Sequence, residues 1–134
     1  MPHQTLDLVH LSRQTGGDAE LEQELLVLFA DQCARQLATI RDAASRQNRC
    51  DAAHTLKGAA FAIGAWEVGE AAAAIEYALA DQKDGPELAA HLKALDKATE
   101  GACAMISSML AVAETTVTSQ PVSTIFRKIL FLQP

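Results

Sequence analysis

Apolar residues three and four positions apart recur along most of this chain, and this spacing constrains its fold more than any other feature. The clearest run lies between residues 21 and 40, where the large apolar residues are Leu21, Leu25, Leu28, Phe29, Leu37 and Ile40. Such spacing places the side chains on one face of an α-helix. Many alanines stand between them, and aromatic residues make up only 4% of the chain. Alanine favours helices whereas strands favour β-branched and aromatic residues, so we expect an all-α fold.

Turn and cap residues divide the helical pattern into five segments. Gly16 and Gly17 end the first segment, and Asp18 is the expected N-cap of the second. The expected helices are residues 6–13, about 19–45, from Asn48 or Asp51 to near Gly64, 66–80, and Pro86 to about 112. Short connections favour antiparallel neighbours, so the sequence predicts an up-down-up-down four-helix bundle with a short additional N-terminal helix.

The C-terminal residues differ in composition from the rest of the chain. The 134 residues suffice for one ordinary domain. The composition changes at Thr115, and Pro121 blocks continuation of the fifth helix. We therefore expect one bundle domain over residues 1–113 and a C-terminal tail over residues 114–134. The tail contains the apolar stretch IFRKILFL, which leaves three alternatives open: docking on the bundle, pairing with another chain in a homo-oligomer, or disorder.

Charge and cysteine usage restrict the classes of partner. The net charge of −6 argues against nucleic acid, whose phosphates require a basic surface. No apolar stretch approaches the ~20 residues that span a bilayer, and the first residues lack a signal-peptide pattern. Three cysteines without a CxxC pair indicate reduced thiols, with Cys33 and Cys103 in the core, so we expect a cytoplasmic protein. Cys50 and His54 have no further ligand at helical spacing, so we predict no metal site.

The stretch AHTLKGAAFAIGA, residues 53–65, carries the candidate chemistry. At about 100° per residue, His54, Lys57, Gly58 and Phe61 share one helix face, which we expect to point outward. The opposite, inward face consists of Ala52, Leu56, Ala59, Ala60 and Ile63. Gly58 lacks a Cβ and lets another molecule approach the imidazole, while Phe61 offers that molecule an apolar contact. Lys57 supplies positive charge, so this face suits the transfer of a phosphoryl group, which needs mainly positioning and charge stabilisation.

This stretch resembles the signature of histidine-containing phosphotransfer (HPt) domains, the intermediates of multi-step His–Asp phosphorelays. The matching residues are His54, Leu56, Lys57, Gly58, Gly64 and Ala65. The LLVLF helix before the site and the AAAAIEYAL helix after it fit the same family, and the resemblance covers residues 6–112. Ala62 departs from the family pattern, which often has a small polar residue near this position.

The resemblance implies a phosphoryl carrier without independent catalytic turnover, and so not an enzyme. His54 would accept the phosphoryl group on a ring nitrogen, Nε2, from the aspartate of a receiver domain and pass it to another receiver. Lys57 would neutralise the phosphoryl oxygens, and Gly58 would leave room for the receiver. The expected partners are response-regulator receiver domains or a hybrid sensor kinase. The chain would need no cofactor of its own, since Mg²⁺ would be held by the receiver.

Two neighbouring interpretations bear on this prediction. Dimerisation-phosphotransfer domains of sensor kinases also carry a phosphorylated histidine, typically followed by Glu or Asp, whereas Thr55 follows His54 here. Autophosphorylation from ATP is therefore not expected. The second interpretation is a non-catalytic helical adaptor in which His54 is never phosphorylated.

For the carrier, we expect a docking surface centred on Gly58 and Phe61 that extends over Gln32, Arg35 and Gln36 of the second helix.

Overall fold

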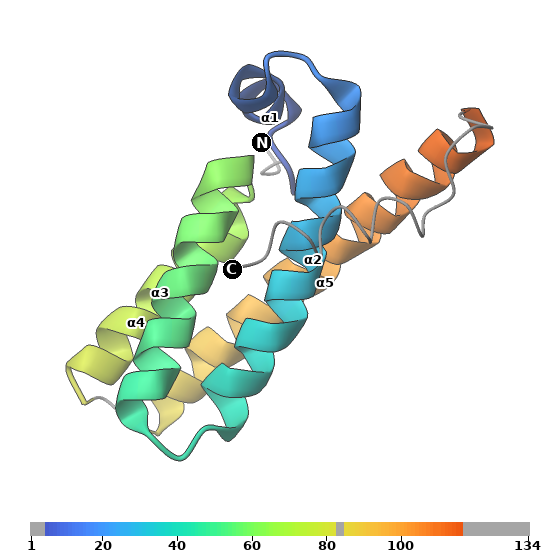
Figure 1. Cartoon of the computed structure of the whole chain (residues 1–134). Coiled ribbons are helices and arrows are strands. Elements are labelled where there is room, and N and C mark those ends of the chain that lie inside the picture. Colours follow the sequence, from blue (N-terminus) through green and yellow to red (C-terminus); the bar gives the residue numbers. More distant parts are fainter. Residues whose placement is uncertain (1–4, 83–84, 117–134) are drawn as a thin grey trace.

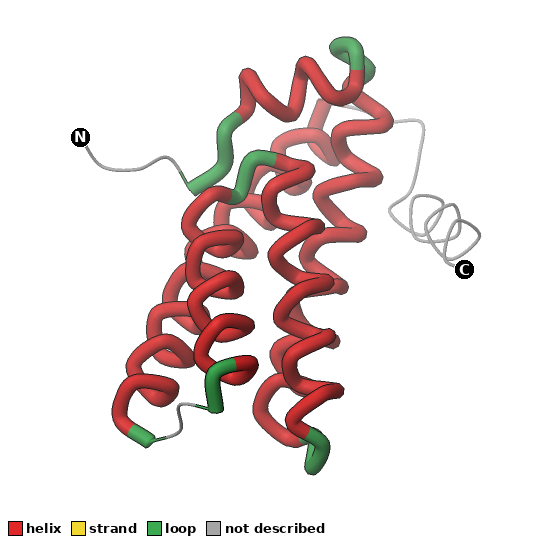
Figure 2. The backbone as a smooth tube through the Cα atoms, turned by 90° about the vertical axis from the view of Figure 1, so that its left-hand side faces the viewer, coloured by secondary structure: helices red, strands yellow, loops and turns green. Residues whose placement is uncertain are grey.

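The structure is a computed structural model that describes residues 5–82 and 85–116, with side-chain surroundings up to residue 112. The described residues form five α-helices and no strand: α1 (Leu8–Thr15), α2 (Ala19–Asp42), α3 (Arg46–Ile63), α4 (Trp66–Ala80) and α5 (Pro86–Thr116). Helices α2 to α5 form an antiparallel bundle in which each packs on the next and α5 also contacts α2 (Figure 1). The short α1 lies across one end of the bundle, against α2 and α3 (Figure 2). The predicted all-α architecture is confirmed.

Several predicted helix ends are found in the structure. Asp18 caps α2, because its carboxylate accepts a hydrogen bond from the Leu21 backbone N–H at 3.1 Å. Gly16 and Gly64 end α1 and α3 in the left-handed conformation, with φ of 65° and 86°. Pro86 begins α5. These predicted ends are confirmed. Each could be predicted because one residue there has a strong local preference for starting or ending a helix.

Other helix ends differ from the prediction. Helix α1 covers residues 8–15 rather than 6–13, because Asp7 caps it by accepting a hydrogen bond from the His10 N–H at 3.0 Å. Helix α3 begins at Arg46, before Asn48 or Asp51, because the Ser45 hydroxyl caps it. Helix α2 accordingly ends at Asp42 instead of residue 45, and α5 continues to Thr116. Residues 114–116, which were predicted to begin the C-terminal tail, belong to α5. The rest of the predicted tail, residues 117–134, with its predicted docking, pairing or disorder, lies outside the described residues.

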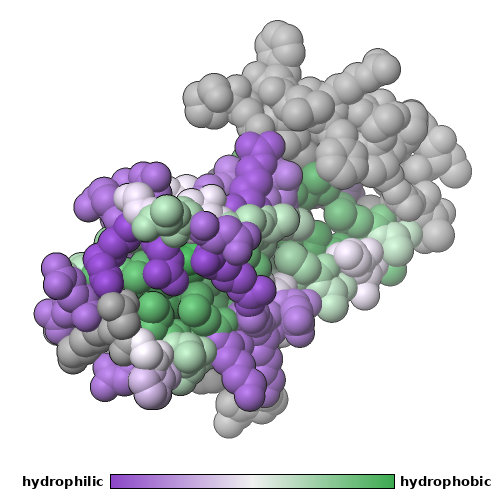
Figure 3. All heavy atoms as spheres, turned by 90° about the horizontal axis from the view of Figure 1, so that it is seen from below, coloured by the Kyte–Doolittle hydropathy of each residue, from purple (hydrophilic) through white to green (hydrophobic). Residues whose placement is uncertain are grey.

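The bundle core combines large aliphatic side chains with alanines. Seen from the end that carries the α2–α3 connection, hydrophobic residues gather at the centre and hydrophilic residues at the rim (Figure 3). Side chains exposed by 2% or less are Leu26, Phe29, Cys33 and Ile40 of α2; Ala53, Leu56 and Ala60 of α3; Val68, Ala72, Ile75 and Leu79 of α4; and Leu95, Ala102 and Ile106 of α5. The small alanines of α3 and α4 let these helices pack closely along their lengths.

A polar cluster fastens α1 beside the turn between α3 and α4. The backbone N–H of Asp7 donates to the Gly64 carbonyl at 2.9 Å, and the Trp66 indole donates to the Asp7 carboxylate at 3.1 Å. The His10 ring packs edge-on against Trp66, with centroids 4.8 Å apart. Hydrogen bonds from the His10 backbone and from Trp66 lower the pKa of Asp7 below its ordinary value. A Cβ on Gly64 would lie 2.9 Å from the Asp7 carbonyl oxygen, so glycine is required there for both its φ and its size.

Candidate functional site

Helix α3 presents His54 to solvent from the middle of the bundle. The His54 side chain is 66% exposed, whereas Leu56 and Ala60 of the predicted inward face are fully buried. The predicted orientation of α3 is therefore confirmed. Lys57, one turn further on, is partly buried, with 28% of its side chain exposed. The histidine and the lysine both lie on the side of α3 that borders α4.

Glu76 of α4 connects these two side chains through one carboxylate. Its Oε2 lies 2.8 Å from His54 Nδ1, and its Oε1 accepts a hydrogen bond from Lys57 Nζ at 2.6 Å. A carboxylate can only accept, so Nδ1 carries the hydrogen in this contact. In the neutral ring the lone pair then lies on Nε2, the nitrogen away from Glu76. The contact thus orients the imidazole and leaves the lone pair of the neutral ring on Nε2.

Glu76 provides the negative charge in this group. Burial acts to raise the pKa of Glu76, but hydrogen bonds and charge from Lys57 and His54 outweigh it, and the pKa falls below its ordinary value. The carboxylate is therefore ionised at neutral pH. It balances the charge of Lys57 and can stabilise any positive charge that develops on the imidazole.

Gly58 and Phe61 lie on the same face, but only Gly58 is as open as predicted. A Cβ built on Gly58 meets no atom within 4 Å, so the surface beside His54 is free of steric obstruction. Phe61 is 37% exposed, and its ring lies over Gly69 of α4, where an added Cβ would come within 2.4 Å. The ring also lies beside Trp66, with centroids 6.0 Å apart. One side of Phe61 therefore packs against α4, and the remainder is available to a partner.

The three residues predicted on α2 are held by neighbours on the same helix. Gln36 donates a hydrogen bond to Gln32 at 2.9 Å, and Arg35 pairs with Asp31 at 2.9 Å. Gln32 and Gln36 are half-buried, whereas Arg35 is exposed. The role of these three residues in docking stays a prediction.

Glu76 was not predicted from the sequence, although a signal for it exists. It is the one charged residue in the stretch AAAAIEYALA, residues 71–80, where the helix otherwise consists of apolar residues and one tyrosine. A single carboxylate in such an apolar stretch indicates a specific partner. The sequence does not reveal that this partner is the His54 and Lys57 pair, 22 and 19 residues away.

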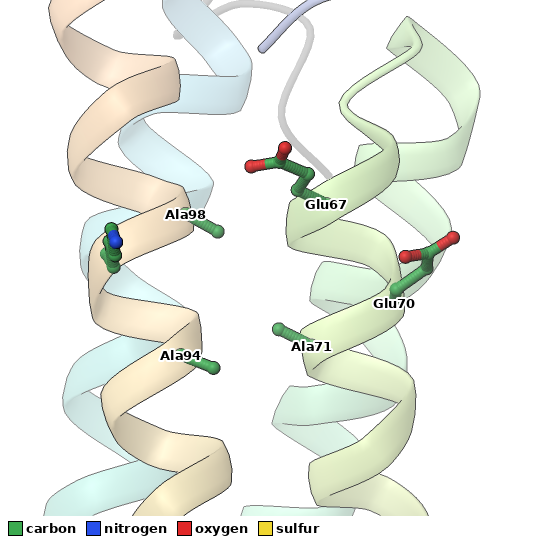
Figure 4. Close-up of a pocket in the computed structure, with 6 residues that line it drawn as sticks. Glu67, Glu70, Ala71, Ala94 and Ala98 are labelled. Carbon is green, nitrogen blue, oxygen red and sulfur yellow. The ribbon is translucent and has the colours of Figure 1, made fainter. Parts of the chain in front are cut away.

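Other surfaces of the described chain offer less chemistry. No group of three or more His, Cys, Asp or Glu residues able to hold a metal ion occurs within residues 5–82 and 85–116. A shallow pocket between α4 and α5 is lined by Glu67, Glu70, Ala71, Ala94, Lys97 and Ala98 (Figure 4). It lies on the side of α4 that faces α5, whereas Glu76 meets His54 on the side that faces α3. In the same described ranges, no helix has the length and apolarity to cross a membrane.

Comparison with known proteins identifies the class to which this fold and site belong. The model of the Hpt domain family matches residues 24–113, which include the exposed histidine, and the chain belongs to this family. Membership supports a general role as a phosphorelay carrier that interacts with receiver domains or kinases. Among solved structures, the chain is similar to the crystal structure of the histidine phosphotransferase ShpA from Caulobacter crescentus. The TM-score is 0.64 at 22% identity, and the match covers 87% of this chain and 100% of that one. No curated protein matches the chain.

Proposed function

We propose that this protein relays a phosphoryl group between the aspartates of receiver domains, with His54 as the residue that carries it. The observation that supports this most is the orientation of the imidazole. Glu76 holds Nδ1 at 2.8 Å on one side of the ring, and the side chain is 66% exposed. The nitrogen that can attack a phosphorus atom is therefore directed away from the protein.

The reaction follows from this arrangement. The Nε2 lone pair attacks the phosphorus of an aspartyl phosphate on the receiver, forming an N–P bond while the bond from phosphorus to the aspartate oxygen breaks. The ring keeps its hydrogen on Nδ1 and becomes a cation, which the Glu76 carboxylate stabilises across the same hydrogen bond. Transfer to the next receiver reverses these bond changes and returns a neutral imidazole.

Lys57 has two roles in this proposal. Before transfer, its ammonium group pairs with Glu76 at 2.6 Å and helps to hold the carboxylate. During transfer, the flexible side chain can turn toward the phosphoryl group as it approaches the neighbouring imidazole, because the oxygens of that group are negatively charged. The chain needs a partner for the remaining chemistry, because Glu76 is the one carboxylate in this group and Lys57 already neutralises it. Mg²⁺ therefore belongs to the receiver in this proposal, and the protein acts as a carrier without turnover of its own.

Gly58 and Phe61 provide the surface on which a receiver can approach. The open space at Gly58 allows the acidic site of a receiver to reach Nε2. The exposed part of Phe61 offers an apolar contact nearby, and Gln32, Arg35 and Gln36 extend the proposed surface over α2. The cytoplasm, where such relays operate, remains the proposed location.

Phosphoryl transfer from a receiver tests this proposal. A receiver domain labelled on its aspartate is mixed with the wild-type chain, with His54→Ala and with His91→Ala, a matched control in a half-buried histidine of α5. We expect label on the wild type and on His91→Ala, stable in alkali and labile in acid, and none on His54→Ala. A second, unlabelled receiver should then remove the label. No transfer from a panel of receivers would instead favour the helical adaptor.

A further inference from the structure

Trp66 connects the N-terminal helix to the docking surface that contains Phe61. Its side chain is half-buried at the start of α4, and its ring has two aromatic neighbours from other helices. The His10 ring of α1 meets it edge-on, with centroids 4.8 Å apart. The Phe61 ring of α3 lies beside it, with centroids 6.0 Å apart. Both separations are typical of favourable aromatic pairs. Trp66 is therefore in contact with α1 and with the residue that we expect a receiver to touch.

The start of α1 fixes the orientation of this indole. One carboxylate oxygen of Asp7 accepts a hydrogen bond from the His10 backbone N–H at 3.0 Å, and the other accepts one from Trp66 Nε1 at 3.1 Å. Asp7 and His10 are in turn attached to the end of α3. The Asp7 N–H donates to the Gly64 carbonyl at 2.9 Å, and His10 Nε2 donates to the Ala62 carbonyl at 3.1 Å. An indole has a single donor, so its bond to Asp7 selects one orientation of the ring.

The position of the Phe61 ring depends on this indole. The ring occupies the space above Gly69, where an added Cβ would lie 2.4 Å from a ring carbon, and 37% of the residue is exposed. Gly69 provides this space but has no side chain that could hold the ring in one orientation. Trp66 supplies a neighbouring aromatic surface instead. The orientation of the indole therefore influences how much of Phe61 faces a partner.

We propose that Trp66 is a positioning residue of the docking surface: held by Asp7 and His10, it sets the orientation in which Phe61 meets a receiver domain. This inference rests on the proposed function, because the receiver is the partner that would bind there. His54 lies about two helical turns before Phe61 on α3. Loss of the Trp66 contacts should therefore weaken docking and leave the chemical step at His54 unchanged.

Two substitutions disturb the positioning contacts by different routes. Trp66→Leu keeps an apolar side chain but removes the ring beside Phe61. Asp7→Asn keeps the size of the cap residue, and asparagine caps helices about as well as aspartate. Its amide has one acceptor oxygen, however, and cannot accept from both the α1 backbone and the Trp66 indole. Asp18→Asn is the matched control, because it makes the same change at the N-cap of α2, where the carboxylate accepts from the Leu21 N–H.

The dependence of phosphoryl transfer on receiver concentration tests the proposal. Each full-length variant is mixed with increasing concentrations of a receiver labelled on its aspartate, and the rate at which label appears on His54 is measured. We expect Trp66→Leu to raise the receiver concentration that gives half the maximal rate by about 3–10-fold, the effect of one aromatic pair. Asp7→Asn should raise it in the same direction. The maximal rate should stay at the wild-type value, and Asp18→Asn should match the wild type in both quantities.

A double-mutant cycle shows whether Trp66 acts through Phe61. Phe61→Ala alone should raise the half-maximal receiver concentration. In the Phe61→Ala background, neither Trp66→Leu nor Asp7→Asn should have a further effect, because no ring remains to be positioned. Thermal melts show which variants are folded. Asp7→Asn, which keeps the size of the side chain, carries the comparison if Trp66→Leu does not fold.

The contrary results separate this proposal from the proposed function. Wild-type half-maximal concentrations in Trp66→Leu and Asp7→Asn would refute the positioning role and leave the carrier function intact. A reduced maximal rate at an unchanged half-maximal concentration would assign Trp66 to the chemical step and would also refute it. Additive effects in the cycle would mean that Trp66 does not act through Phe61. A wild type that takes no label from any receiver would instead overturn the carrier function, and the docking role with it.

Discussion

Replacement of Glu76 by glutamine tests whether the bridging carboxylate prepares His54 for transfer, because the two side chains differ mainly in charge. In the wild-type chain one oxygen faces Lys57 Nζ at 2.6 Å and the other faces His54 Nδ1 at 2.8 Å. An amide has one acceptor oxygen and one NH₂ group, so it cannot accept both hydrogen bonds. The charged Lys57 takes the oxygen, and the NH₂ group faces Nδ1. The neutral imidazole then carries its hydrogen on Nε2, where the lone pair is needed.

The size of the effect follows from the exposure of the contacts. The side chains of Glu76 and Lys57 are 24% and 28% exposed. The pair therefore lies between an exposed ion pair, at about 0–1 kcal/mol, and a buried hydrogen bond to a charged group, at about 1.5–3 kcal/mol. We expect Glu76→Gln to lower the free energy of unfolding by about 1–2 kcal/mol. By analogy with the outer partners of metal-bound histidines, transfer to His54 should slow by about 10–100-fold.

Single-turnover measurements separate these two effects. Excess phosphorylated receiver is mixed with each variant, and the label on His54 is followed in time, while thermal melts report stability. Glu70→Gln is the matched control, since it makes the same charge change at an exposed position of α4. We expect it to transfer and melt like the wild type. If Glu76→Gln accepts the phosphoryl group as fast as Glu70→Gln, the carboxylate does not set the reactive form of His54.

Three further predictions concern the same face of the protein. The pKa of Glu76 in the folded chain lies below its ordinary value of 4.5, so its stabilisation is complete above that pH and is lost as pH falls through the folded value. Denaturant titrations should therefore show the wild type and Glu76→Gln converging in stability below pH 4.5. Gly58→Ala should stabilise the helix by up to about 1 kcal/mol, because its Cβ enters open space, yet slow transfer from the receiver. Stabilisation with undiminished transfer would contradict a close approach at Gly58. Gly69→Ala should displace the Phe61 ring, because its Cβ would lie 2.4 Å from a ring carbon. Heteronuclear NMR should detect this as shifted Phe61 ring resonances, and unchanged resonances would contradict the packing described.

The fold could be predicted because its determinants are local. Apolar spacing at threes and fours identifies a helix face whatever that face packs against, and Gly64 or Asp18 marks an end without reference to the rest of the chain. The ends that were predicted wrongly have several residues able to act as caps. Ser45, Asn48 and Asp51 could each cap the start of α3, and the structure uses Ser45. Which of them acts as the cap depends on where tertiary packing starts the helix, because the first backbone N–H groups of a helix have no partner within it.

The candidate site was predictable only as far as one helix carries it. His54, Lys57 and Gly58 share a face because successive residues turn by a fixed angle around α3. Glu76 reaches that face from α4. Its position along α4 relative to His54 depends on how the two helices pack, and a single sequence does not specify this packing. Phe61 was predicted to point outward on the same angular argument. In the structure one side of the Phe61 ring packs against α4, in the space that Gly69 leaves because it has no side chain.

The nitrogen that carries the phosphoryl group provides the most direct test of the central claim, that Glu76 leaves Nε2 of His54 as the nucleophile. The chain is labelled with nitrogen-15, phosphorylated by a receiver, and studied by long-range proton–nitrogen correlation in the His54 ring. We expect the phosphorus coupling on Nε2, with Nδ1 still protonated and hydrogen-bonded to Glu76. A phosphoryl group on Nδ1, or on any residue other than His54, would contradict the account.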